Sequence, residues 1–308
     1  MPPFHAALAE GPEQVQLRWV ATEDGVRLRL GLWTAADARA TVLLFPGRTE
    51  YLEKYGRVAM DLIKAGFNVA AIDWRGQGYS DRLIADTRLG HVQNFADYQK
   101  DVRAFVAAVD AFKLSGPRVL LAHSMGGCIG LRALIDGLAV ERAVFSAPMW
   151  GIHVMPALRP AAKVLPTLAR LAGSHLKVMP GTSPESYVLE TNLADSLLTS
   201  DVDHYGYLRR QAEASTELAL AGPTIHWFEV AHEEMSALYD AARPEIPVLT
   251  LVGTNEEVVE LDAIKSAHDL WPSATLEIVP GAKHEMMMEV PGIRSHFMKR
   301  AIDFLSAS

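Results

Sequence analysis

The feature that most constrains the fold of this chain is a series of short, continuous apolar segments. Residues 41–47 read TVLLFPG, residues 67–73 read FNVAAID and residues 118–124 read RVLLAHS. Segments with helical spacing, at 51–66 and 94–112, alternate with them. Unbroken apolar strands are typical of parallel sheets that are covered on both faces. The sequence therefore predicts an α/β fold, with a mostly parallel central sheet and helices on both faces.

The same pattern predicts elements along most of the chain. Strands are expected at 26–35, 41–47, 67–73, 118–124, 142–148, 247–253 and 274–280. Helices are expected at 51–66, 94–112, 126–137, 224–242, 260–270 and 292–306. Asn94 is a suitable N-cap for the second of these helices, because its side chain can accept a hydrogen bond from a free backbone N–H.

The alternation of strands and helices is interrupted at about Trp150 and resumes at 247–253. Residues 151–180 contain four lysines and arginines and no acidic residue, although the whole chain has a formal net charge of −8. Helical spacing dominates this interval. We expect an α/β core made of residues 1–149 and 225–308, interrupted by a helical cap over residues 150–224.

Composition limits the classes of function. The chain has 308 residues, of which 49% are hydrophobic, so it can bury a large core. Its negative charge argues against nucleic acid as a partner. The single cysteine, Cys128, rules out an intrachain disulfide and is typical of a reducing compartment. With neither a visible secretory signal nor an uncharged apolar stretch of roughly 18 residues, we expect a cytoplasmic protein that at most touches a membrane.

Ser124 stands at the carboxyl end of a predicted buried strand, and small residues surround it in AHSMGG, residues 122–127. A strand that turns sharply into a helix exposes the residue at the corner, and strand and helix then approach too closely for large neighbours. This is the arrangement of a G-x-S-x-G nucleophile elbow, with Ala122 in place of the first glycine. The sequence predicts that Ser124 is a nucleophile, and that the N-terminus of the following helix favours an anion there.

A serine needs a base to take its proton, and the base needs a carboxylate to orient it. Of the eleven histidines, His284 follows a predicted strand and a short loop, so it too lies beyond the carboxyl end of a strand. The carboxylate should follow the strand at 247–253, where the chain reads TNEEVVE and no aspartate is present. Glu256 and Glu257 are both candidates. Acyl transfer also needs donors for an oxyanion, and we expect the backbone N–H groups of Met125 and Arg48 to supply them.

These residues resemble the α/β-hydrolase superfamily, and within it the monoglyceride lipase and bacterial lysophospholipase branch, which is also grouped as serine aminopeptidase S33-like. The resemblance covers nearly the whole chain. It depends on FPGRTEYLEKY at 45–55, DWRGQGYSD at 73–81, AHSMGG at 122–127, SAPM at 146–149, VGTNEEVV at 252–259 and GAKHEMMME at 281–289.

The resemblance implies Ser124 as nucleophile, His284 as base and Glu256 as the triad acid, at a position where most of the family has aspartate. The family's oxyanion loop usually contains His-Gly, whereas this chain has Pro46-Gly47, which is similar to the lysophospholipase form. Glu50 matches an acidic residue of that loop and is expected to brace it.

The function that follows is that of a serine hydrolase which cleaves carboxylic esters through an acyl-enzyme, without a metal or cofactor. Monoacylglycerols and lysophospholipids are the substrates that the resemblance favours. The basic, apolar stretch 151–180 of the cap would either cover the acyl pocket and touch an anionic lipid surface transiently, or only pack on the core with its cations exposed. The alternatives are a carboxylesterase, thioesterase or peptidase acting on small non-lipid substrates, or a non-catalytic hydrolase-like binding protein. The sequence leaves the oligomeric state open.

Overall fold

The apolar segments form one eight-stranded sheet in the computed structural model, which describes residues 1–307. The strand order is β1-β2-β4-β3-β5-β6-β7-β8, and the strands from β4 to β8 in this order are parallel, while β1 and β2 are antiparallel to their neighbours. The strands are β1 Gln16–Ala21, β2 Arg27–Trp33, β3 Ala40–Phe45, β4 Phe67–Asp73, β5 Arg118–His123, β6 Ala143–Ser146, β7 Val248–Gly253 and β8 Ala274–Val279. The predicted α/β fold with a mostly parallel sheet is confirmed.

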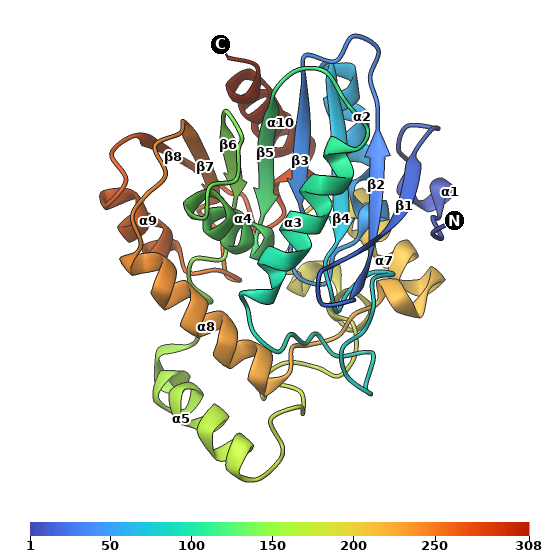
Figure 1. Ribbon diagram of the computed structural model, residues 1–308. Helices are drawn as coiled ribbons and strands as arrows, with labels where there is room; N and C mark the ends of the chain where they lie inside the picture. The colour runs from blue at the N-terminus through green and yellow to red at the C-terminus, as the bar shows by residue number, and fades with distance from the viewer. Residues whose placement is uncertain (308) are drawn as a thin grey trace.

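Helices cover both faces of the sheet. Figure 1 shows α3 and α4 in front of it and α2 and α10 behind it. The α-helices are α1 Ala6–Ala9, α2 Gly56–Lys64, α3 Asp97–Asp110, α4 Met125–Ile135, α5 Arg159–Leu171, α6 Tyr187–Glu190, α7 Val202–Ala214, α8 Ile225–Asp240, α9 Leu261–Asp269 and α10 Pro291–Ser306. Short 3₁₀ helices are η1 Leu52–Tyr55, η2 Pro156–Leu158, η3 Leu193–Asp195, η4 Thr216–Leu218 and η5 Met286–Met288.

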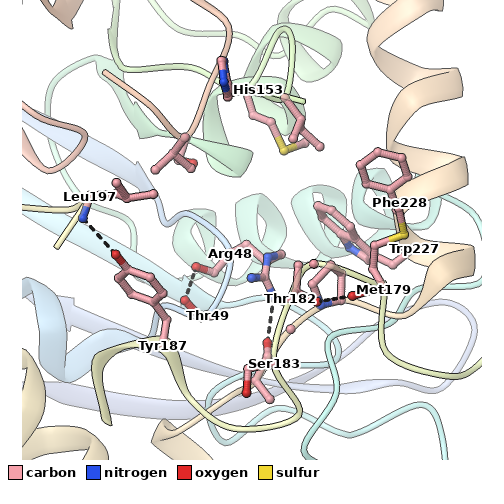
Figure 2. Close-up of a pocket in the computed structure, with 18 of the residues that line it drawn as sticks. Arg48, Thr49, His153, Met179, Thr182, Ser183, Tyr187, Leu197, Trp227 and Phe228 are labelled. Carbon is pink, nitrogen blue, oxygen red and sulfur yellow. Dashed lines mark hydrogen bonds between the residues drawn. The ribbon is translucent and has the colours of Figure 1, made fainter. Parts of the chain in front are cut away.

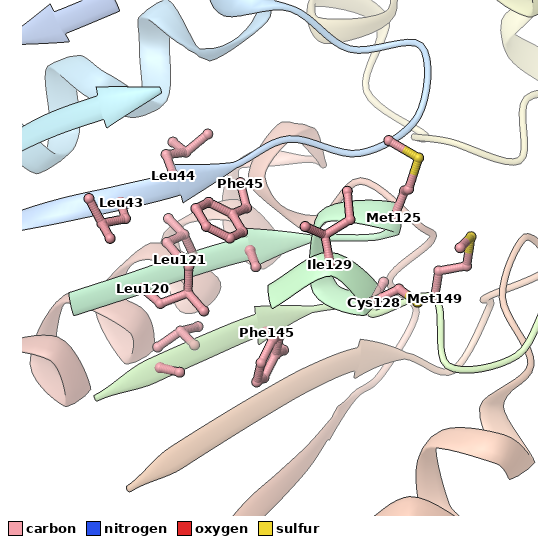
Figure 3. Close-up of a cluster of buried hydrophobic side chains, with 14 of the residues drawn as sticks. Leu43, Leu44, Phe45, Leu120, Leu121, Met125, Cys128, Ile129, Phe145 and Met149 are labelled. Carbon is pink, nitrogen blue, oxygen red and sulfur yellow. The ribbon is translucent and has the colours of Figure 1, made fainter. Parts of the chain in front are cut away.

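The core lies between the central strands and these helices. Figure 3 shows Leu43 and Phe45 of β3 beside Leu120 of β5, and Ile129 of α4 belongs to the same buried cluster. All four side chains are fully buried. Cys128 is buried in the same cluster, as a small core residue. Because strands β3, β5 and β6 are buried on both faces, their sequences are continuous apolar runs, which is the signal that the sequence carried.

One expectation about local structure is wrong, and one strand was not predicted. The helix expected to begin at Asn94 begins at Asp97, and its N-cap is Ala96. The Asp97 carboxylate accepts a hydrogen bond from the Asn94 N–H at 3.2 Å. The side chain of Asp97 therefore binds the backbone of Asn94, whereas the expected cap had the Asn94 side chain binding the backbone of the helix. Strand β1 was not predicted, because QLRWVA is a half-exposed edge strand without a continuous apolar run.

The interval between β6 and β7 contains helices and no named strand within the described residues. Figure 1 shows its helices α5 and α8 below the sheet, at the edge where the parallel strands end. The segment therefore lies on the side of the sheet where open α/β folds place their ligands. None of the helices in residues 1–307 is both long enough and apolar enough to cross a bilayer.

The turn from β5 into α4 is very tightly packed. Ser124 occupies it with φ of 50°, a left-handed conformation that non-glycine residues rarely adopt. A Cβ atom on Gly126 would lie 2.1 Å from the Phe45 carbonyl oxygen, and one on Gly127 would lie 2.6 Å from the Pro148 Cβ. The neighbours of the serine must therefore be small, as the sequence pattern predicted.

This packing predicts the effect of Gly126→Ala. The new methyl group meets backbone atoms that cannot move aside, so we expect the free energy of unfolding to fall by about 3 kcal/mol or more. Urea denaturation followed by circular dichroism measures the change. Gly292→Ala is the matched control, because a Cβ atom there meets nothing within 4 Å. We expect that control to keep or slightly raise stability, and equal stability of the two variants would contradict the close approach.

Candidate active site

Ser124 lies at the centre of the site, at the carboxyl end of β5. Its Oγ is 2.9 Å from Nε2 of His284, which stands in the loop after β8. Both residues are buried, with 8% of Ser124 and 3% of His284 exposed. The structure thus brings together two residues that lie 160 positions apart in the sequence.

Glu256 completes a chain of three hydrogen-bonded side chains. Its Oε2 is 2.8 Å from Nδ1 of His284. Its Oε1 accepts hydrogen bonds from the backbone N–H groups of Val258 and Val259 at 2.7 and 3.0 Å. Because an ionised carboxylate can only accept, Nδ1 of His284 carries the proton and Nε2 is free to accept from the serine hydroxyl. This is the tautomer that a general base for Ser124 requires.

The electrostatics of Glu256 suit that role. Burial alone would raise its pKa, but the His284 ring and the two backbone N–H groups hold the pKa below its usual value. The side chain of Glu256 is completely buried, so its charge acts on His284 without solvent screening. Glu257, the other candidate from the sequence, is exposed and makes no contact with the His284 ring among the described residues. The structure therefore separates two glutamates that sequence reasoning alone left open.

The two expected oxyanion donors belong to segments that meet next to Ser124, because Gly126 closely approaches the Pro46 carbonyl oxygen. Met125 is the first residue of α4, and Arg48 lies in the loop after β3. Within residues 1–307, neither backbone N–H has a hydrogen-bond acceptor. The loop is fixed from behind, because Trp74 Nε1 donates to the Pro46 carbonyl at 2.9 Å and Gln77 Nε2 donates to the Gly47 carbonyl at 2.8 Å. Two free donors on these adjoining segments are what a developing oxyanion would need.

A buried ionic cluster lies behind the site and connects its loops. Glu50, the predicted brace, accepts hydrogen bonds from the Gly47 N–H and from the Lys54 ammonium. Lys54 also contacts Glu285, the residue after His284, at 2.5 Å. His123 donates from Nδ1 to the Ser146 carbonyl, and its Nε2 faces Glu285 and Glu50 at 3.4 and 3.5 Å. The cluster therefore ties the oxyanion loop, the histidine loop and the end of β5 to one another.

Charges in this cluster support one another. Burial alone would lower the pKa of Lys54, but the Glu285 and Glu50 carboxylates raise it above its usual value. The same carboxylates raise the pKa of His123 against the effect of burial. Conversely, Lys54 and His123 hold the pKa of Glu285 well below its usual value, although burial opposes this. The cluster is thus held together by compensating charges that are shielded from water.

Two groups of residues have the spacing of metal ligands. The possible ligand atoms of Glu50, His123 and Glu285 lie within 4.8 Å of one another, but the Lys54 ammonium already contacts both carboxylates. The second group is Asp201, Asp203 and His204 at the start of α7, away from the serine. Acidic groups of this kind are common without an ion, and neither group adds to the chemistry at Ser124.

A large cavity opens over Ser124 and His284. Its volume is about 1040 Å³, and its lining is mostly apolar. Figure 2 shows Met179, Trp227 and Phe228 among the side chains that face it. The segment between β6 and β7 supplies most of the apolar lining, including Leu158, Leu165, Leu168, Met179, Leu218 and Phe228. The space beside the serine hydroxyl therefore suits a ligand with a long apolar part.

Sequence reasoning did not find the whole site. Lys54 and Glu285 were not singled out, and His123 was not chosen among the eleven histidines. The signals for the first two were present, because Lys54 follows Glu50 by four residues and Glu285 follows His284 directly. The motif DWRGQGYSD at 73–81 lies in a turn, where Asp73 pairs with Arg29 at 2.7 Å and Arg75 pairs with Asp101 at 2.7 Å. That turn is a structural ion-pair site.

Comparison with known proteins adds independent findings. A family model described as "Serine aminopeptidase, S33" matches residues 36–291. Lysophospholipase L2 of Escherichia coli is 32% identical over 302 residues, with 92% of this chain and 85% of that protein covered. A probable lysophospholipase L2 of Haemophilus influenzae is 28% identical over 298 residues, with 96% and 93% covered.

Solved structures show the same architecture. A soluble variant of monoglyceride lipase from Saccharomyces cerevisiae, in complex with a substrate analog, superposes with a TM-score of 0.73. The two chains are 19% identical, and 96% of this chain and 98% of that chain are covered. At this level of identity the likeness concerns the fold, and it extends over the segment between β6 and β7 as well as over the sheet.

The hydrogen bonds at His284 predict different effects for two neighbouring glutamates. Glu256→Gln removes the charge and allows the amide to favour the wrong tautomer of His284, so we expect kcat to fall by about 10²- to 10⁴-fold. Glu257→Gln should change kcat only a few-fold, because Glu257 lies outside the hydrogen-bonded chain. Steady-state hydrolysis of a p-nitrophenyl ester measures both. The opposite ranking would assign the acid to Glu257.

Proposed function

The chain belongs to the serine aminopeptidase S33 family of α/β-hydrolases and is a serine ester hydrolase; from this premise we propose that it cleaves single-chain lipid esters, lysophospholipids or monoacylglycerols, with Ser124, His284 and Glu256 as its catalytic triad. The observation that carries the proposal is the hydrogen-bonded series Ser124–His284–Glu256 at the floor of a large apolar cavity.

The first half of the reaction forms an acyl-enzyme. Nε2 of His284 takes the Ser124 proton as Oγ attacks the ester carbonyl carbon. The resulting oxyanion accepts hydrogen bonds from the N–H groups of Arg48 and Met125, and the positive end of the α4 dipole adds to its stabilisation. Glu256 stabilises the imidazolium. When the tetrahedral intermediate collapses, His284 returns the proton to the leaving alcohol, and the acyl group stays on Oγ.

The second half regenerates the enzyme. Nε2 of His284 takes a proton from a water molecule, whose oxygen attacks the acyl carbonyl. The same two N–H groups hold the second oxyanion. His284 then protonates Ser124 Oγ as the carboxylic acid leaves. Every proton therefore passes through one imidazole nitrogen, which requires the tautomer that Glu256 maintains.

The shape of the cavity supports a lipid as substrate. Its volume of about 1040 Å³ exceeds what a short acyl ester would fill, and apolar side chains dominate its wall. Each methylene group of a bound acyl chain that leaves water contributes about 0.8 kcal/mol. The relatives named lysophospholipase L2 point in the same direction.

We assign residues 150–224 the role of a cap over a core formed by 1–149 and 225–308. Apolar side chains are exposed on this cap, and several of them also line the cavity. They are Met155, Leu158, Val164, Leu168, Leu171 and Leu176. Leu171 is the most exposed of these six, at 82%. With basic and no acidic residues at 151–180, this surface is suited to brief contact with an anionic lipid surface, from which a substrate enters the cavity.

A panel of esters tests the proposal directly. Wild-type protein is offered p-nitrophenyl esters of increasing acyl length, a 1-monoacylglycerol and a lysophospholipid. We expect kcat/KM to rise by about threefold to fourfold for each added methylene until the cavity is filled, as burial of apolar surface requires. Ser124→Ala should lose at least about 10³-fold of the activity on every ester while keeping its melting temperature.

Different outcomes have different meanings. Activity that falls with acyl length would indicate a small-ester carboxylesterase and would contradict a lipid substrate. Undiminished turnover by Ser124→Ala would remove this residue from the mechanism. Absence of all hydrolysis, together with absence of Ser124 labelling by a fluorophosphonate, would indicate a binding protein instead of an enzyme.

A further inference from the structure

One cation in the substrate cavity has no anionic partner. The Arg48 side chain lines the cavity, and among residues 1–307 no carboxylate lies within ion-pair distance of its guanidinium. Lys54 also lines the cavity, and its ammonium group contacts both Glu50 and Glu285. Arg48 donates one hydrogen bond, from Nη1 to the Ala221 carbonyl at 2.9 Å. Most of the donors of this guanidinium therefore remain unused.

The unused donors face open space. Arg48 is half-buried, its unbonded nitrogen atoms keep some accessible surface, and the residue lines the cavity. Figure 2 shows Arg48 among the lining side chains, between Thr49 and Trp227. Its guanidinium lies 5.6 Å from the centre of the Trp227 ring, which provides an aromatic face but no negative charge. A Cβ atom on Gly90 would lie 3.2 Å from Nη1, so a glycine there leaves room for the charged group.

An unpaired cation of this kind is costly unless a ligand compensates it. Burial lowers the pKa of Arg48 to about 10, which still leaves it protonated at neutral pH. Guanidinium groups bind phosphate and carboxylate oxygens through two parallel hydrogen bonds. Thr182 and Ser183 also line the cavity, and their segment packs against Gly222, next to Ala221.

We propose that the Arg48 guanidinium is the specificity-determining contact of the cavity: it binds the phosphate of a single-chain phospholipid and so favours that substrate over a neutral monoacylglycerol. This inference rests on the proposed function, because it assumes that an ester is cleaved at Ser124. The backbone N–H of Arg48 faces the ester oxyanion, and its side chain is about as long as the glycerol unit that separates an ester from a head-group phosphate. One residue can therefore contact both parts of the same substrate.

The test compares two substrates with the same acyl chain, 1-acyl lysophosphatidic acid and 1-monoacylglycerol. The quantity measured is the ratio of kcat/KM for the lysophosphatidic acid to kcat/KM for the monoacylglycerol. Because Arg48 also supplies a backbone donor, the ratio isolates the side chain from any general loss of activity. In Arg48→Met the ratio should fall by about 10- to 100-fold, the loss typical of a charge-assisted contact. Arg48→Lys should restore part of the ratio, since it keeps the charge but not the two-pronged geometry.

Arg170→Met is the matched control. Arg170 is an exposed arginine of the cap that is paired with Glu229, so this variant removes the same charge from the protein without touching the cavity. The ratio should then stay within about twofold of the wild-type value. A similar fall in both variants would mean that the net charge of the protein, and not Arg48, attracts the anionic substrate. Melting temperatures of all variants show that each is folded.

The remaining outcomes separate other roles for Arg48. Equal losses on both substrates would make Arg48 only a brace for the 219–223 segment and would overturn the proposal. An unchanged ratio combined with weaker inhibition by free fatty acid would show that Arg48 binds the carboxylate of the product, which also overturns it. If wild-type protein hydrolyses neither substrate, the proposed function itself fails. If it hydrolyses both and the ratio is unaffected by Arg48→Met, only this inference fails.

Discussion

The close approach of Gly126 to the Phe45 carbonyl is the contact on which the site depends. It allows the first turn of α4 to lie directly against the end of β3, so the loop that begins at Pro46 runs beside Ser124. One backbone contact thus sets the position of the serine and of the Arg48 N–H together. The left-handed conformation of Ser124 belongs to the same arrangement, because the chain must reverse from strand to helix within one residue. The strain is maintained by the fully buried strands on both sides.

A second set of interactions fixes the relative positions of the loops around Ser124. The oxyanion loop and the His284 loop come from opposite ends of the sequence, and neither contains a long element of regular structure. Lys54 connects them, because it contacts Glu50 on one side and Glu285 on the other, while His123 joins this cluster to β5. All these charges are buried, so loss of one partner would leave another without compensation. Ser124 and His284 are therefore positioned by a buried ionic framework as well as by the sheet.

Most of the fold could be predicted because its strands and turns have recognisable local sequence patterns. The continuous apolar run at 67–73 gives β4 with the same limits, and the small residues around Ser124 predict the turn that the packing requires. Strand β1 could not be found, since an exposed edge strand does not need an apolar pattern. Glu256 and Glu257 could not be separated by residue type alone, because the choice depends on which carboxylate the loop turns toward His284. The unpaired state of Arg48 was likewise beyond sequence reasoning, because it depends on the absence of acidic residues from distant segments.

The central claim is that the oxyanion of the reaction forms on a carbonyl attacked by Ser124 and is held by the N–H groups of Arg48 and Met125. A crystal structure of the protein after reaction with an alkyl fluorophosphonate tests it most directly, because the tetrahedral phosphorus imitates the reacting carbon. The account predicts phosphorus bonded to Ser124 Oγ, with one phosphonyl oxygen about 2.7–3.1 Å from both nitrogen atoms. Phosphorus on another residue, or a phosphonyl oxygen turned away from both N–H groups, would contradict it.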